Sequence, residues 1–325
     1  MVAIRQAFDG DGPVLSEIER NTPLVFDDRS LYIDRGDDYF ATARLMENAA
    51  VLLAEVDGTP AGVFCGAPHD ALIGGIRRRM LYVHHSRILP EYQRLGLGLK
   101  LANALFEHFK DTGVDSQYWY ISTTNERSQG FARRATNRWS FCPVMVDLDL
   151  AKIAGAPAGR PATPADAPRI VDILNAAHEG EEMFLPYTPE SFAARVSRAP
   201  RQYGWDRVWL TNSAVVGVWP EGESITLRFT APDGSTSQSR GAAVLDYGCL
   251  PGGEAELVAL LGAWASALMA RGFDGMSCFS SPGSRLAPVI LTLAGEHSEF
   301  NFWTPQIPEP PGAADRGLYV DHIYF

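Results

Sequence analysis

Tyr-Gln-Arg-Leu-Gly-Leu-Gly-Leu, residues Tyr92 to Leu99, is the stretch that decides the fold of this 325-residue chain. An apolar segment that predicts a strand, 80–89, precedes it, and apolar residues at helical spacing follow it over 100–110. Glycines at such a junction let the backbone close tightly, and the first N–H groups of a helix attract anions. The stretch therefore predicts an anion site, to which Arg94 adds a positive charge.

The chain also repeats its own pattern at an offset of 155 residues. The residues that recur are Arg5, Ala7, Asp11 and Pro13 as Arg160, Ala162, Asp166 and Pro168, and Gly62-Val63-Phe64 as Gly217-Val218-Trp219. The four residues from Arg5 to Pro13, and likewise their counterparts from Arg160 to Pro168, predict a strand, a turn and a helix with proline near its first turn. Several independent matches at one offset indicate an internal duplication.

The same offset places the counterpart of the anion site at residues 247–253, Tyr-Gly-Cys-Leu-Pro-Gly-Gly. In this alignment Arg94 becomes Cys249 and Gly96 becomes Pro251, which removes a cationic side chain and a backbone donor. We therefore predict that only the first copy keeps the anion site.

Further matches extend the repeat towards the end of each copy. Helices are predicted over 100–110 and 254–271, and Gly113-Val114-Asp115 then resembles Gly272-Phe273-Asp274. The predicted domains are 1–150 and 160–325, joined by a linker at 151–159 that is rich in Ala, Gly and Pro.

Composition restricts the partners and the compartment. The formal net charge is −11, of which −2 falls in residues 1–160 and −9 in 161–325, so we expect no nucleic-acid groove and a preference for cationic small molecules. The longest uncharged apolar run, 257–270, is too short to cross a bilayer, and the N-terminus resembles no secretory signal. Four scattered cysteines predict a reduced, cytoplasmic protein without a metal site, namely Cys65, Cys142, Cys249 and Cys278.

The motif Gln93-Arg94-Leu95-Gly96-Leu97-Gly98 resembles the Gln/Arg-x-x-Gly-x-Gly/Ala signature of the GNAT superfamily of acyl-CoA-dependent N-acetyltransferases. A dinucleotide-binding fold would need an apolar strand running directly into the first glycine, where this chain has Pro90 to Arg94. The resemblance implies an α+β fold, a tandem duplication with a mixed, mostly antiparallel sheet flanked by helices in each domain. Mycothiol synthase-like proteins have a similar layout with catalysis in the second half, whereas here the signature lies in the first, so their substrate is not carried over.

The resemblance also implies acetyl-CoA as cosubstrate and a set of residues that bind it. In the family, backbone groups of the fourth strand line the acetyl-pantetheine arm, the signature holds the pyrophosphate, and an asparagine after the fifth strand contacts the cofactor. On this chain the implied residues are Ser86, Arg87, Ile88, Gln93, Arg94, Leu95, Gly96, Leu97, Gly98, Leu99 and Asn125. The second copy has Ser284 in the place of the asparagine.

Acyl transfer needs a neutral amine, so a base or a water relay is expected. Strand alternation predicts that Tyr82, His84, Ser86 and Ile88 share one face and that His85, which we interpret as structural, points away from it. Family members that use histidines on this strand place a base at the position of His84, although a hydrogen-bonded core histidine would fit equally well. The tyrosine that many members use as general acid is replaced by Ala132, which leaves Tyr82, Tyr118 and Tyr120 as alternatives.

The acceptor is expected to be a small cationic molecule or a peptide amine. In the family the segment between the first two helices recognises the acceptor, and here it is acidic in both copies, with Asp27, Asp28, Asp34, Asp37 and Asp38 in the first and Glu179, Glu181 and Glu182 in the second. The leading hypothesis is an N-acetyltransferase with a catalytic first domain, and the alternative is a non-catalytic acyl-CoA sensor or scaffold. The acceptor's identity, a propionyl or succinyl donor and the oligomeric state stay open.

Overall fold

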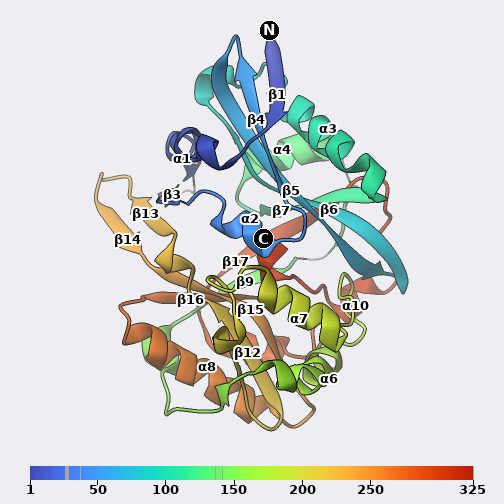
Figure 1. Cartoon of the computed structure of the whole chain (residues 1–325), viewed down its shortest axis with the longest axis vertical. Helices are drawn as coiled ribbons and strands as arrows, with labels where there is room; N and C mark the ends of the chain where they lie inside the picture. The colour runs from blue at the N-terminus through green and yellow to red at the C-terminus, as the bar shows by residue number, and fades with distance from the viewer. Residues whose placement is uncertain (26–28, 37, 136, 141, 325) are drawn as a thin grey trace.

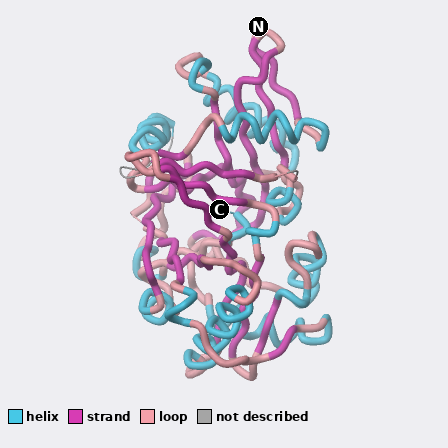
Figure 2. The backbone as a smooth tube through the Cα atoms, turned by 90° about the vertical axis from the view of Figure 1, so that its left-hand side faces the viewer, coloured by secondary structure: helices cyan, strands magenta, loops and turns pink. Residues whose placement is uncertain are grey.

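The computed structural model describes residues 1–325 except 26–28, 37, 136, 141 and 325. In this described part, thirteen strands form one continuous sheet that runs through both halves of the molecule (Figures 1 and 2). The strand order is β1 (Val2–Gln6), β4 (Ala50–Val56), β5 (Thr59–Ile73), β6 (Ile76–Ile88), β7 (Ser116–Ser122), β17 (Ala294–Thr304), β9 (Val144–Leu148), β16 (Gly275–Ser280), β15 (Gly241–Cys249), β12 (Ala214–Trp219), β11 (Val208–Leu210) and β10 (Arg160–Pro161), with β8 (Asn137–Arg138) beside β17.

Helices cover both faces of this sheet (Figure 1). Those of the first half are α1 (Gly12–Arg20), α2 (Ala41–Leu45), α3 (Leu97–Phe109), α4 (Glu126–Ala135) and α5 (Leu150–Ile153). Those of the second half are α6 (Ala167–Ala177), α7 (Pro189–Arg198), α8 (Glu254–Met269), α9 (Ala287–Thr292) and α10 (Ala313–Arg316). None of the helices in the described ranges is both long and apolar enough to cross a membrane.

Alternation along the strands assigns each helix to a face. In β4, Val51 and Leu53 pack with α1, whereas Leu52 and Ala54 pack with α3 on the opposite face. In β12 of the second half, Val215 joins the core under α6 and α7, while its neighbours Ala214 and Val216 pack on α8. The apolar run 257–270 coincides with α8 except for its last residue, and most of its side chains are buried.

The predicted duplication is confirmed by two pairs of motifs with matching geometry. Arg5 Nη2 lies 2.7 Å from Asp11 Oδ1, and Arg160 Nη2 lies 2.5 Å from Asp166 Oδ1. Both aspartates precede the first long helix of their half with the same backbone angles, φ −84° and ψ −7°. The predicted fold class, a mixed and mostly antiparallel sheet flanked by helices in each half, is also confirmed, because only β6–β7 and β15–β16 are parallel among the described pairs of the large sheet.

The second pair of motifs closes the turn before each parallel strand. Gly113 and Gly272 both adopt a left-handed conformation, with φ of 78° and 76°. Asp115 accepts the backbone N–H of Arg79 at 2.9 Å and donates its own to the carbonyl of Arg79. Asp274 makes the same two bonds with Arg240, so the glycine and aspartate of the repeat form the same turn in both halves.

The two halves exchange strands where they meet. β17, from the end of the chain, pairs antiparallel with β7 of the first half. β9, from the first half, lies between β17 and β16 and pairs with both. A four-stranded sheet also bridges the halves, in the order β14 (Thr236–Ser239), β13 (Thr226–Thr230), β3 (Ser30–Asp34) and β2 (Leu24–Val25). The division into 1–150, 151–159 and 160–325 stays a prediction about the chain, and the sheet itself is shared.

Candidate functional site

The stretch Tyr92–Leu99 forms a turn that ends in the first turn of α3. Arg94 and Gly96 have φ of 71° and 73°, and Gly96 is the N-cap of α3. The first helical bond runs from Lys100 N–H to Gly96 O at 3.2 Å, so the N–H groups of residues 97–99 precede it at the helix start. A Cβ built on Gly96 would meet nothing within 4 Å, which leaves open space beside these donors.

Gln93 supports the turn from the other side. Its Nε2 donates to Ile88 O at 3.0 Å, which ties the turn to the last residue of β6. Arg94, by contrast, is exposed to solvent. The sequence prediction placed both residues on the cofactor, and the geometry gives Gln93 a part in shaping the turn.

β6 and β7 diverge beside this turn. Their parallel pairing runs from Met80–Ser116 to Tyr82–Tyr118 and stops there, although both described strands continue, to Ile88 and Ser122. The backbone of Arg87 and Ile88 pairs with β5, whereas the pairing of β6 with β7 has already ended at Tyr82. Asn125 follows β7, and its Oδ1 accepts the N–H of Ser128 at 3.0 Å, so it caps α4.

A β-bulge in β6 overturns part of the predicted alternation. Cys65 pairs with His84 and Val63 with Arg87, so the strand carries one extra residue, and His85 has φ of 46°. After the bulge the faces are exchanged: Arg87 Nη2 lies 3.9 Å from Glu19 of α1, while Ile88 contacts the α3 side near Gly98. The expectation that Ile88 shares the face of His84 was wrong for this reason.

The same bulge corrects the orientation predicted for His85. Instead of pointing away, His85 places Nδ1 2.6 Å from His84 Nδ1. His84 stacks on Tyr82, with ring centroids 4.8 Å apart and an interplanar angle of 2°, so these two share a face as predicted. Burial, together with the nearby charge of Arg35, lowers the pKa of His84 to about 3, which makes its imidazole a weak base.

Arg35 and Glu19 complete this cluster and were missed by the sequence analysis. Arg35 Nη2 lies 2.5 Å from His85 Nε2, and its Nε donates to Glu19 Oε2 at 2.6 Å. The side chains are 3% and 1% exposed, so this ion pair is buried. One signal existed: Glu19 follows Leu15 and Ile18 on the apolar face of α1, where an unpaired carboxylate would be costly.

Cys65 brings a third metal-binding atom near the two histidines. The ligand atoms of Cys65, His84 and His85 lie within 4.8 Å of one another. However, the histidine Nδ1 atoms face each other, Arg35 occupies His85 Nε2, and burial raises the pKa of the Cys65 thiol to about 12. This arrangement favours a hydrogen-bonded cluster, and the expectation that the chain has no metal site stays a prediction.

The three tyrosines considered as general acids lie together. The ring centroids of Tyr82 and Tyr118 are 5.2 Å apart, and those of Tyr82 and Tyr120 are 6.0 Å apart. The Tyr118 hydroxyl lies 2.7 Å from His69 Nε2, whereas Tyr82 is the one stacked on His84. Phe302 from β17 packs on Tyr118 with centroids 5.4 Å apart, so the second half helps to enclose the cluster.

The counterpart of the turn in the second half differs from its predicted alignment. Tyr247 lies inside β15, where its hydroxyl donates to Phe279 O at 2.6 Å, so it does not correspond to Tyr92. The connection from β15 to α8, residues 250–253, is shorter than the connection 89–96 from β6 to α3, so the fixed offset of 155 does not align the two turns. The second-half turn, 250–253, still has no arginine, and Glu254 places a carboxylate in the first turn of α8, where it repels an anion.

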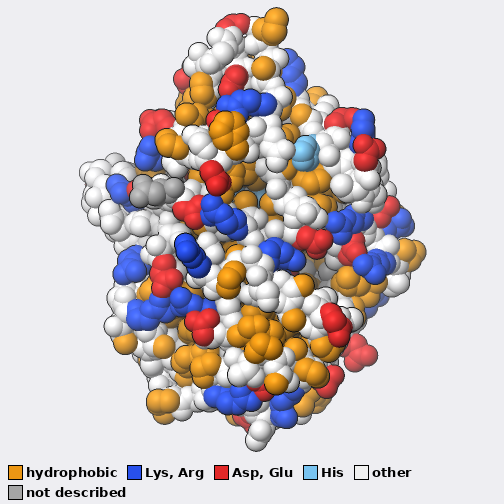
Figure 3. Space-filling model, in the orientation of Figure 1, with side chains coloured by type: hydrophobic (Ala, Val, Ile, Leu, Met, Phe, Trp, Pro, Cys, Tyr) orange, Lys and Arg blue, Asp and Glu red, His pale blue; other side chains and the backbone are white. Residues whose placement is uncertain are grey.

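Several of the acids expected to attract the acceptor already have partners. Asp34 Oδ2 lies 2.8 Å from Arg228, and Asp38 Oδ1 lies 2.5 Å from Arg44. Glu181 accepts the hydroxyl of Ser284 at 2.5 Å. Asp27, Asp28 and Asp37 lie outside the described residues. Figure 3 shows acidic and basic side chains interspersed over one face of the molecule.

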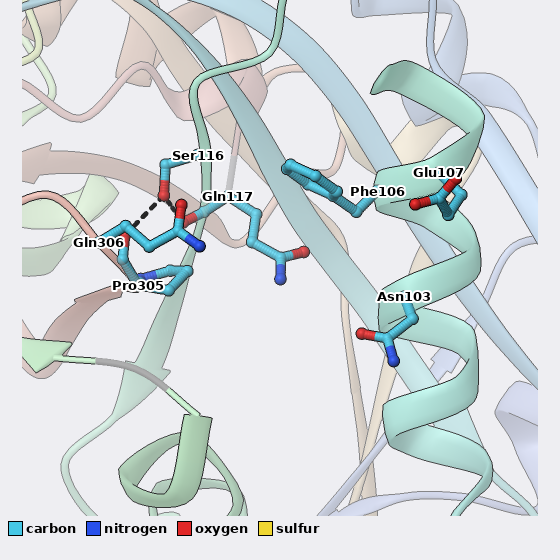
Figure 4. Close-up of a pocket in the computed structure, with 7 residues that line it drawn as sticks. All are labelled: Asn103, Phe106, Glu107, Ser116, Gln117, Pro305 and Gln306. Atoms are coloured by element: carbon cyan, nitrogen blue, oxygen red, sulfur yellow. Dashed lines mark hydrogen bonds between the residues drawn. The ribbon is translucent and has the colours of Figure 1, made fainter. Parts of the chain in front are cut away.

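An open pocket of about 310 Å³ lies where the first half meets the residues after β17 (Figure 4). It is bounded by α3, by the start of β7 and by the residues after β17, and its lining includes Glu107, Gln117 and Gln306. Ser116 closes one side by donating to Pro305 O at 2.7 Å. None of the residues that line this pocket belongs to the predicted site.

Residues 14–136, from α1 to the end of α4, match the profile described as the acetyltransferase (GNAT) family. Residues 14–136 form a GNAT domain. The match includes the turn at Tyr92–Leu99 and both histidines, and it supports acyl transfer from an acyl-CoA to an amine. No curated protein matches the chain.

Solved structures show that the fold extends over both halves. N-myristoyltransferase of Saccharomyces cerevisiae, with bound myristoyl-CoA, aligns with 98% of this chain and 89% of its own, at 9% identity and a TM-score of 0.68. A GCN5-related N-acetyltransferase from Kribbella flavida aligns with 94% of this chain and 70% of its own, at 16% identity and a TM-score of 0.53. The second half therefore shares the arrangement of the GNAT domain, and likeness at these identities concerns the fold alone.

Proposed function

We propose that this protein is an acetyl-CoA-dependent N-acetyltransferase that acts on an amine and whose GNAT domain carries the catalytic site. The observation that carries the proposal is the end of the parallel β6–β7 pairing at Tyr82–Tyr118, after which β6 leads through Ser86–Ile88 to the N–H groups at the start of α3 beside Gly96. Residues 93–99 would hold the pyrophosphate and Ser86–Ile88 the pantetheine arm. Asn125, after the end of β7, is proposed as a further contact.

A short acyl group is supported by the packing beside His84. The rings of Tyr82, Tyr118 and Phe302 are buried against one another, which limits the room for a long chain. Burial raises the pKa of Tyr82 well above its usual value, so its hydroxyl is protonated at neutral pH and can donate a hydrogen bond to the leaving sulfur. We therefore propose Tyr82 as the acid for the leaving thiolate. The net charge of −9 in residues 161–325 supports a cationic acceptor, such as a small amine or a peptide amine.

Substitution of Gly96 by alanine is expected to weaken acetyl-CoA binding at least about tenfold, a change of about 1.4 kcal/mol. The added methyl group would meet no protein atom within 4 Å, but it would project into the space proposed for the pyrophosphate. Gly113→Ala is the matched control, because Gly113 also has a left-handed φ, of 78°, and an open surrounding. Isothermal calorimetry with acetyl-CoA measures the affinity of both variants. Equal affinities would contradict the proposed pyrophosphate site at residues 93–99.

Release of the CoA thiol tests the transfer itself. We expect thiol to appear only when an amine is added, and faster with acetyl-CoA than with propionyl-CoA or succinyl-CoA. A panel of polyamines, aminoglycosides and peptide amines would rank the acceptors. One bound acetyl-CoA per chain without any amine-dependent release would indicate the alternative, a non-catalytic acyl-CoA sensor.

A further inference from the structure

Arg35 determines the direction of a hydrogen-bond chain through His85 to His84. A guanidinium has only donors, so its contact of 2.5 Å with His85 Nε2 requires a lone pair on that nitrogen. Neutral His85 then carries its hydrogen on Nδ1 and donates it to His84 Nδ1 at 2.6 Å. His84 Nδ1 is thereby an acceptor, and the single hydrogen of neutral His84 lies on Nε2.

The hydrogen-bond chain is fixed at the end formed by Arg35. Arg35 donates from Nε to Glu19 at 2.6 Å and from Nη1 to Thr42 Oγ1 at 3.0 Å. Its guanidinium is therefore fixed by two elements, α1 and α2, before it reaches His85. Bonds in such a chain polarise one another, so the positive charge of Arg35 strengthens the final donor on His84.

That final donor is buried and has no partner among the described residues. His84 is 7% exposed, and its Nε2 makes no hydrogen bond with the described protein atoms. A buried donor without a partner lowers the stability of the folded protein by about 1–3 kcal/mol. The unpaired Nε2 of His84 therefore calls for an explanation. The hydrogen bond from His85 to Nδ1 and the stacking on Tyr82 hold the imidazole in this orientation.

We propose that His84 donates a hydrogen bond from Nε2 to the thioester carbonyl oxygen, with Glu19, Arg35 and His85 as positioning residues. This rests on the proposed acyl transfer. The amine lone pair attacks the carbonyl carbon, a C–N bond forms, and the carbonyl electron pair moves to the oxygen that His84 stabilises. When the carbonyl re-forms, the C–S bond breaks, CoA leaves as thiolate, and the proton lost by the amine ends on the thiol, through solvent or an acid. His84 keeps its hydrogen throughout, so it acts as an oxyanion donor instead of the base expected from the sequence.

Nuclear magnetic resonance of the free protein labelled with 15N-histidine tests the tautomer without any activity. We expect a pyrrole-type Nε2 and a pyridine-type Nδ1 for His84, and the reverse for His85. The double variant Glu19→Gln/Arg35→Met removes both charges of the buried pair together and is expected to give mixed tautomers, whereas Arg35→Lys retains a pure donor and keeps the wild-type pattern. A hydrogen on His84 Nδ1 in the wild-type protein would overturn the proposal.

Kinetics of two variants separate a donor from a base. His84→Ala is expected to lower kcat about 10²- to 10³-fold, the usual cost of losing an oxyanion donor. A glutamine amide can donate from near the position of Nε2 but cannot accept the amine's proton, so His84→Gln is expected to turn over at least about tenfold faster than His84→Ala. Its kcat/KM should also keep the pH profile of the wild-type protein.

The outcomes distinguish this inference from the proposed function. If His84→Gln binds acetyl-CoA and retains its circular dichroism spectrum but is as slow as His84→Ala, the donor role is refuted. A wild-type protein that shows the Nε2–H tautomer but no amine-dependent thiol release would refute the proposed function and the catalytic role, while confirming the hydrogen-bond chain.

Discussion

The first half, expressed alone as residues 1–157, is expected not to form the native sheet. β7 would lose its neighbour β17, and β9 would lose both of its partners, β16 and β17. Phe302 and Trp303, which are 0% and 4% exposed, would no longer cover the core of the GNAT domain. Unpaired, apolar strand edges favour aggregation over folding.

Two separate chains, 1–157 and 158–325, are the control for this experiment. The break follows Pro157, which lies on an exposed segment, so co-expression should return a one-to-one complex with native circular dichroism and native acetyl-CoA affinity. Size-exclusion chromatography and thermal unfolding measure the result. A monomeric 1–157 that unfolds cooperatively and binds acetyl-CoA would show that the shared sheet is dispensable.

Replacement of Arg195 by methionine is expected to lower the free energy of unfolding by about 3–5 kcal/mol. Arg195 is buried, and it contacts Asp246 Oδ2 at 3.0 Å and Asp321 Oδ2 at 2.6 Å. Its removal would leave two carboxylates without a counter-ion beneath the C-terminal segment. Urea unfolding at neutral pH measures the change.

A matched surface variant separates burial from charge. Arg285→Met removes an arginine that lies 3.1 Å from Glu254, but both side chains are at least 35% exposed, so the expected loss is below about 1 kcal/mol. Adding Asp246→Asn and Asp321→Asn to Arg195→Met should recover part of the lost stability. Similar losses for Arg195→Met and Arg285→Met would contradict the role assigned to the buried cluster.

Local patterns predicted much of the candidate site because they depend on neighbours in the sequence. The turn at Tyr92–Leu99, the helix after it and the strand that carries His84 follow from glycine positions and apolar spacing. The bulge at His85 could not be predicted, since it arises from a register mismatch with β5. For the same reason the alternation rule failed at Ile88. The alignment of Tyr247 with Tyr92 failed because the connection before α8 is shorter than the one before α3.

The sequence by itself determined that the chain holds two copies of one fold and that the glycine turn with its arginine belongs to the first. Both conclusions rest on spacings of a few residues, and such spacings indicate local secondary structure because it depends on near neighbours in the sequence. Only the tertiary structure decided that β9 and β17 change places between the copies and that Glu19 and Arg35 meet the two histidines. These contacts join residues far apart in the chain, where burial and charge pairing, and not spacing, select the partners.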